Sequence, residues 1–113
     1  MVIEEIRDAF TSGIPVEYKA HCLERMLERD ISRKDIKDCI MSGEIIEEYF
    51  LDESNISETS YPSCLIFGIT TNGHKNLHVV VGYNSKTIII ITAYYPDLEH
   101  WTSDYKTRRN NYV

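Results

Sequence analysis

The sequence lacks several features that would point directly to a class of protein. It contains no CxxC pair, no glycine-rich phosphate loop and no apolar run close to the roughly 18 to 20 residues that a membrane span needs. Its N-terminus, MVIEEIRDAF, is acidic and lacks the basic and then apolar pattern of a signal peptide. We therefore expect no membrane association and a location in the cytoplasm.

The pattern of cysteines and histidines is not that of a metal site. Cys22, Cys39 and Cys64 are widely spaced and stand among apolar residues, which favours reduced thiols packed in a core over disulfides or nucleophiles. His74 and His78 are four residues apart, but no carboxylate or cysteine stands beside them at a usual ligand spacing. The sequence therefore predicts no metal and no cofactor.

An excess of basic charge is also absent, because 12 basic and 18 acidic residues give a net charge of −6. Residues 1–60 hold 15 acids and 7 bases, whereas residues 61–113 hold 3 acids and 5 bases. The overall charge argues against strong nonspecific binding to nucleic acid. A polyanion would nevertheless meet the C-terminal half first, because attraction depends on the local charge.

The periodicity of apolar residues predicts helices in the first part of a single domain of 113 residues. Helices are expected at residues 2–12, at Val16–Arg29 and after Ser32. Ser32 looks like an N-cap, with Asp35 three residues later as its capping-box partner. Gly43 is expected to end the third helix.

After Gly43 the apolar period changes from 3.6 to 2, which indicates strands. Strands are expected at 44–51, 63–71, 76–83 and 86–95, with a polar loop at 52–61. Turns are expected at Asn72-Gly73 and Asn84-Ser85. The C-terminal tail could hold a short helix. The prediction is an α+β fold in which two or three N-terminal helices pack on one face of a four-stranded antiparallel meander.

The third expected strand alternates sharply, and this alternation assigns its two faces. Leu77, Val79 and Val81 are expected beneath the helices, so that His78 lies on the open face. A two-residue turn at Asn84-Ser85 would place His78 opposite Ile91. A three-residue loop would place it opposite Thr92, on the same face as Tyr94. Both registers remain open, as does a purely structural histidine hydrogen-bonded within the sheet.

A row of polar residues on the second helix suggests chemistry on a phosphodiester. His21, Arg25 and Arg29 are spaced four apart. Metal-free RNA cleavage needs a base, an acid and cations at the phosphate, roles that suit histidine and arginine. The groups for these roles come from His21, His78, Arg25 and Arg29, with Tyr94 as a further proton donor or positioning group. In the alternative interpretation the row is solvent-facing, and its arginines form weak ion pairs with neighbouring glutamates.

Six ordered segments resemble a small prokaryotic family classed as a domain of unknown function. They are H-x-x-x-R-M-x-x-R-x-I (21–31), GEIIEEY (43–49), YPSCLIFG (61–68), LHVVVG (77–82), ITAYYPD (91–97) and W-x-x-D-Y-K-x-R-R (101–109). That family is similar to RelE-like and BrnT-like toxins, which are metal-independent endoribonucleases with a BECR-type fold. The resemblance implies an RNA-cleaving site, an RNA substrate and a cognate antitoxin of the YgiT zinc-finger type as partner.

The resemblance and the chemistry together give two groups of candidate residues. The expected catalytic residues are His21, Arg25, His78 and Tyr94. The expected RNA-binding residues are Arg29, Lys75, Thr92, Trp101, Arg108 and Arg109. The expected product ends are a 2′,3′-cyclic phosphate and a 5′-hydroxyl. The alternative function is a noncatalytic protein-interaction or regulatory module derived from such a toxin, since RelE-like toxins are usually strongly basic and this chain is acidic.

Overall fold

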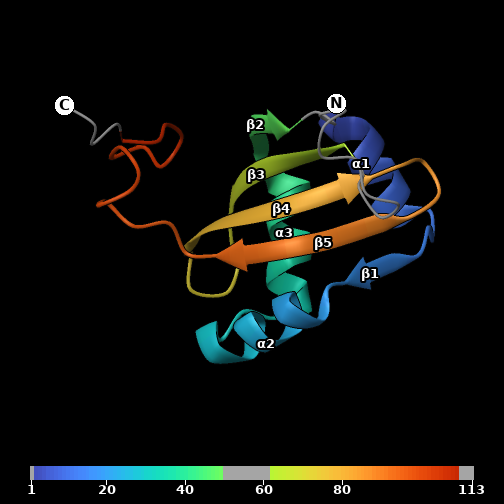
Figure 1. Ribbon diagram of the computed structural model, residues 1–113, viewed down its shortest axis with the longest axis horizontal. Helices are drawn as coiled ribbons and strands as arrows, with labels where there is room; N and C mark the ends of the chain where they lie inside the picture. The colour runs from blue at the N-terminus through green and yellow to red at the C-terminus, as the bar shows by residue number, and fades with distance from the viewer. Residues whose placement is uncertain (1, 50–61, 110–113) are drawn as a thin grey trace, which may run out of the picture.

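The computed structural model describes residues 2–49 and 62–109, and these residues have the predicted α+β architecture. The elements are α1 (Ile3–Thr11), β1 (Val16–Tyr18), α2 (Ala20–Arg29), α3 (Arg33–Ser42), β2 (Glu44–Tyr49), β3 (Ser63–Ile69), β4 (Asn76–Tyr83) and β5 (Ile88–Tyr94). The strands form one sheet with the order β1-β5-β4-β3-β2. In Figure 1, α3 crosses behind the sheet and α2 lies below β5 and β1.

The predicted four-stranded antiparallel meander is wrong in one respect, because the sheet has five described strands and is mixed. Residues Val16–Tyr18, which were expected to begin the second helix, form β1 and pair in parallel with Ile88–Ile90 of β5. Helix α2 begins only at Ala20. The parallel pair joins segments far apart in the sequence, so the local apolar spacing that predicts a helix contains no signal for it.

The capping box of α3 is confirmed, because both of its hydrogen bonds are present. The backbone N–H of Asp35 donates to Oγ of Ser32 at 3.0 Å, and the N–H of Ser32 donates to the carboxylate of Asp35 at 2.9 Å. Gly43 follows the last helical residue, as expected. The expected polar loop at 52–61 lies outside the described residues. The C-terminal segment contains turns and an isolated bridge between Trp101 and Arg108 in place of a helix.

The register between β4 and β5 differs from both alternatives, because His78 pairs with Tyr94. Tyr83 pairs with Ile88, which leaves a four-residue loop in which the Asn84 side chain accepts hydrogen bonds from the backbone of Lys86 and Thr87. A bulge then adds one residue to β5, because Val81 pairs with Ile90 whereas Val80 pairs with Thr92. Loop and bulge together move the residue opposite His78 to Tyr94, so the two residues share a face, as only the three-residue alternative predicts.

The core lies between the helices and one face of the sheet. The predicted inward-facing residues of β4, Leu77, Val79 and Val81, are fully buried in the same cluster as apolar residues of all three helices. Cys22, Cys39 and Cys64 are also fully buried there as free cysteines, which confirms their assignment to the core. Burial raises the pKa of the Cys39 thiol to about 12. None of the described helices is long and apolar enough to cross a membrane.

Candidate functional site

A pocket of about 440 Å³ lies where β5 ends, between helix α2 and the C-terminal segment. It is lined by Arg29, Tyr94, Tyr95, Asp97, His100, Trp101 and Arg108. Figure 1 shows the C-terminal segment leaving β5 at this end of the sheet. Four of the predicted site residues, Arg29, Tyr94, Trp101 and Arg108, therefore meet in one pocket although three different parts of the sequence supply them.

His78 lies beneath this pocket and is not on an open face. Its exposed fraction is 0%, because Trp101 packs edge-on against its ring with a centroid distance of 4.4 Å. Its Nε2 lies 2.8 Å from the carbonyl oxygen of Tyr105, and its Nδ1 lies 3.2 Å from the hydroxyl of Tyr94. The expected open face is thus covered at this position by the C-terminal segment, which strand alternation could not reveal.

The carbonyl of Tyr105 determines the direction of this chain of hydrogen bonds. A carbonyl oxygen only accepts, so Nε2 of His78 carries the proton and donates it. In the neutral ring Nδ1 is then an acceptor, and the Tyr94 hydroxyl donates to it. Burial lowers the pKa of His78, and it raises the pKa of Tyr94. Both groups are therefore neutral at pH 7, and the Tyr94 oxygen points its lone pairs away from the histidine.

Arg29, the last residue of α2, brings a positive charge to the pocket. Its Nη1 donates to the carbonyl oxygen of Ala93 at 2.8 Å, which holds the side chain against β5. Within residues 2–49 and 62–109, its other guanidinium N–H groups have no hydrogen-bond partner. These groups are therefore available to an anion in the pocket, because an arginine fork matches the oxygens of a phosphate.

Arg108 brings a second positive charge from the C-terminal segment. Its Nε donates to both carboxylate oxygens of Glu47, at 2.8 and 3.1 Å, and its guanidinium lies 4.7 Å from the centroid of the Trp101 ring. Hydrogen bonds to Glu47 and Tyr49 raise the pKa of Arg108. The guanidinium is therefore fixed and charged, while its side chain remains more than half exposed at the pocket.

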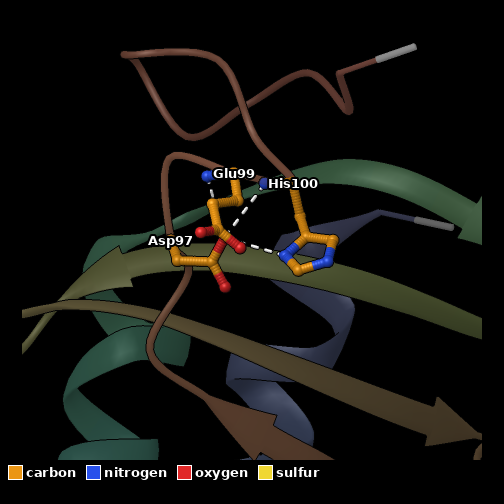
Figure 2. A group of neighbouring side chains, drawn as sticks. All are labelled: Asp97, Glu99 and His100. Carbon is orange, nitrogen blue, oxygen red and sulfur yellow. Dashed lines mark hydrogen bonds and ion pairs between the residues drawn. The ribbon is translucent and has the colours of Figure 1, made fainter. Parts of the chain in front are cut away.

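Asp97 and His100 complete the pocket wall, and neither is among the residues predicted from the sequence. One carboxylate oxygen of Asp97 accepts from Nδ1 of His100 at 2.8 Å and from the backbone N–H groups of Glu99 and His100 (Figure 2). The ligand atoms of these three residues lie within 4.8 Å of one another, but all three are exposed and the turn itself accounts for their arrangement. The available sequence signal was the position of His100 directly before the W-x-x-D-Y-K-x-R-R segment.

The remaining predicted residues lie outside this pocket. On the exposed side of α2, Nε of Arg25 donates to Nε2 of His21 at 3.3 Å and Nη1 of Arg25 pairs with Glu28 at 2.9 Å. Arg109 donates to the carbonyl oxygens of Leu98 and Trp101 and so stabilises the C-terminal segment. Thr92 and Lys75 also do not line the pocket.

The fold and the pocket define a small α+β protein with an arginine- and aromatic-lined site at one end of a mixed sheet. The chain belongs to the family described as "Domain of unknown function (DUF4258)", whose model matches residues 18–95. The matched range includes Arg29, His78 and Tyr94, whereas the segment that carries Trp101 and Arg108 follows it. No curated protein and no solved structure matches the chain.

Proposed function

We propose that this protein is a metal-independent endoribonuclease of the RelE-like or BrnT-like toxin class, acting in the cytoplasm and paired with a cognate antitoxin. The resemblance of six ordered segments supports the class. The observation that carries the proposed chemistry is the hydroxyl of Tyr94, which donates to the buried His78 in a pocket that Arg29 and Arg108 also line. A polar hydroxyl with a proton acceptor behind it and cations nearby suits cleavage of a phosphodiester.

The proposed reaction is an internal transfer within the RNA. The 2′-oxygen of one nucleotide attacks the adjacent phosphorus, and the bond from phosphorus to the 5′-oxygen of the next nucleotide breaks. The 2′-hydroxyl loses one proton and the leaving 5′-oxygen gains one, so no metal or outside reactant is needed. The products are a 2′,3′-cyclic phosphate and a 5′-hydroxyl end.

Tyr94 and His78 together form the proposed base. As the 2′-hydroxyl gives its proton to the Tyr94 oxygen, the proton of Tyr94 moves to Nδ1 of His78. The resulting imidazolium keeps its hydrogen bond to the carbonyl of Tyr105, which lies 2.8 Å from Nε2. His78 acts only through Tyr94, because its ring is fully buried and cannot touch RNA.

The acid and the phosphate contacts come from the other residues of the pocket. In its protonated form His100 would donate to the leaving 5′-oxygen, and Asp97 orients its ring through Nδ1. Arg29 and Arg108 would stabilise the negative charge that grows on the phosphate oxygens. His21 and Arg25 receive no proton transfer in this scheme, because neither lines the pocket; they remain candidate contacts to flanking RNA.

The test incubates purified protein with RNA in excess EDTA and identifies the ends of the products. Cleavage is expected to survive the chelator, and Tyr94→Phe is expected to lower the rate by about 10²- to 10⁴-fold, the range for loss of a general base. Tyr83→Phe is the matched control, because the half-buried Tyr83 hydroxyl on β4 has no hydrogen-bond partner among the described residues.

A wild-type protein that binds RNA or a protein partner without cutting RNA would contradict the proposal and favour the noncatalytic module. The toxin assignment has a separate test in bacteria. Expression of the wild type is expected to arrest growth, and the Tyr94→Phe variant is expected to relieve this arrest at equal protein level. Arrest that persists in the variant would separate toxicity from the proposed chemistry.

A further inference from the structure

A second cavity, of about 360 Å³, adjoins the first pocket at the same end of the sheet. It is lined by His74, Lys75, Asn76, Tyr95 and Pro96. Tyr95 also lines the first pocket, so one aromatic residue forms a wall of both cavities. We infer that the two cavities are adjacent subsites for one single-stranded RNA, with the flanking nucleotide of the cleaved linkage bound in the second.

The sheet itself brings the two cavities together. Strand β4 begins at Asn76 and the antiparallel strand β5 ends at Tyr94, with His78 paired to Tyr94. The residues just before β4 and just after β5 must therefore lie side by side. Because this relationship follows from strand pairing, the second cavity is a fixed part of the fold next to the proposed reaction site.

Tyr95 is held in place between the cavities. Its hydroxyl donates to the carbonyl oxygen of Asp30, the C-cap residue that follows α2, at 3.1 Å. Nζ of Lys75 lies over the Tyr95 ring, 5.2 Å from its centroid. A base that stacks on this ring would take the place of the ammonium group, which would then contact the neighbouring phosphate.

Cationic side chains are present in both cavities. Arg29 and Arg108 line the first cavity, where the carboxylate of Asp97 also lies, and Lys75 lines the second. Lys75 is exposed and forms no ion pair within the described residues, so its ammonium group is available to a phosphate. The net charge of −6 leaves little general attraction for nucleic acid, so binding must depend on this line of cations.

The chemistry of the cavity walls selects single strands over duplexes. The bases of a duplex are stacked and paired, and they cannot enter ring-lined cavities without unwinding. An unpaired strand can place a base against Tyr95 while its phosphates follow the cations. This inference rests on the proposed function and adds the substrate class, single-stranded RNA longer than the cleaved dinucleotide.

The test measures binding of fluorescein-labelled 2′-O-methyl RNA, which has no free 2′-hydroxyl and cannot be cleaved. A dinucleotide and a hexanucleotide that contains it are compared by fluorescence anisotropy over a series of salt concentrations. Lys75→Met is expected to reduce the salt dependence of hexanucleotide binding by about 0.7 in the logarithmic slope, the value for one phosphate of a single strand. Dinucleotide binding is expected not to change. Lys86→Met, at the opposite end of β4 and β5, is the matched control.

The outcomes separate the two levels of the proposal. Equal effects of Lys75→Met and Lys86→Met on hexanucleotide binding would overturn the second subsite and leave the nuclease proposal standing. A duplex that competes as well as a single strand of the same length would also overturn the inference. A wild-type protein that binds neither oligonucleotide would overturn the proposed function itself.

Discussion

Arg108 and Glu47 join the C-terminal segment to strand β2 through hydrogen bonds of 2.8 and 3.1 Å from one guanidinium nitrogen. The two residues are 61 positions apart in the sequence, so the contact closes the molecule between its last described residues and the first strand of the meander. The same guanidinium lies against Trp101, which in turn covers His78. The contact between Arg108 and Glu47 therefore helps to hold the part of the C-terminal segment that lines the pocket.

The Glu47 contact predicts a stability effect that depends on pH. Burial raises the pKa of Glu47, but hydrogen bonds from Arg108 and Tyr49 outweigh burial and hold it below its ordinary value. A carboxylate with a lowered pKa in the folded state contributes stability above its unfolded pKa of about 4.3, and this stability is lost as pH falls through the folded pKa. Arg108→Met should lower the free energy of unfolding by about 0.2–1 kcal/mol at pH 7, and by less at pH 3. Urea denaturation of the wild type and the variant at both pH values measures this effect. A difference in unfolding free energy that is the same at pH 7 and pH 3 would contradict the prediction.

His78 should be neutral and carry its proton on Nε2. Burial lowers its pKa, and the hydrogen bond to the Tyr105 carbonyl opposes this effect without reversing it. A histidine with a lowered folded pKa contributes stability above about pH 6.5, which is lost as pH falls through the folded value. NMR of the ring nitrogens should show a protonated Nε2 and a titration midpoint below 6.5. A proton on Nδ1, or a midpoint above 6.5, would rule out the proposed direction of donation from Tyr94.

Arg7 should stabilise the fold by capping the end of α3. Its Nε donates to the carbonyl oxygen of Ile40 at 2.9 Å, and Nη2 donates to the carbonyl of Gly43. Carbonyl groups in the last turn of a helix have no partner within the helix, and a hydrogen bond from a charged donor contributes about 1.5–3 kcal/mol. Arg7→Met should lower the free energy of unfolding by about that amount. Lys37→Met, on the exposed side of α3, should change it by less than about 0.5 kcal/mol.

Gly68 should not tolerate a side chain, because α3 passes directly over β3 there. A Cβ at Gly68 would lie 2.5 Å from the carbonyl oxygen and 2.8 Å from Cα of Cys39, both of which are backbone atoms. Gly68→Ala should therefore destabilise the protein by about 1–3 kcal/mol, the usual cost of overpacking. The neighbouring Ile69→Ala should have a smaller effect because Ile69 is 47% exposed. Thermal unfolding of the two variants measures this, and equal midpoints would show that α3 moves away freely.

Features that depend on neighbouring residues were the ones the sequence could predict. Ser32 and Asp35 form the expected capping box because its signal spans only three positions. Leu77, Val79 and Val81 face the core because strand alternation is local. The parallel strand β1 could not be predicted in this way, because Val16–Tyr18 is stabilised by a partner at Ile88–Ile90.

The site could be predicted only in part for the same reason. Residue type and sequence motif were sufficient to predict four residues that line the pocket: Arg29, Tyr94, Trp101 and Arg108. The burial of His78 depends on where the C-terminal segment folds, and no periodicity determines that. The bulge that sets Tyr94 opposite His78 likewise has no distinctive residue, since it falls within the run of isoleucines in β5.

The position of β5 in the sheet has a consequence for synthesis. Strand β5 is the last of the described strands to leave the ribosome, yet it lies between β4 and β1 and also bears the contact with α2. A nascent chain that stops before residue 88 therefore has β1 without a partner and Arg29 without Ala93. The proposed active site can form only after nearly all described residues have been made, so a truncated product would be inactive as well as unstable.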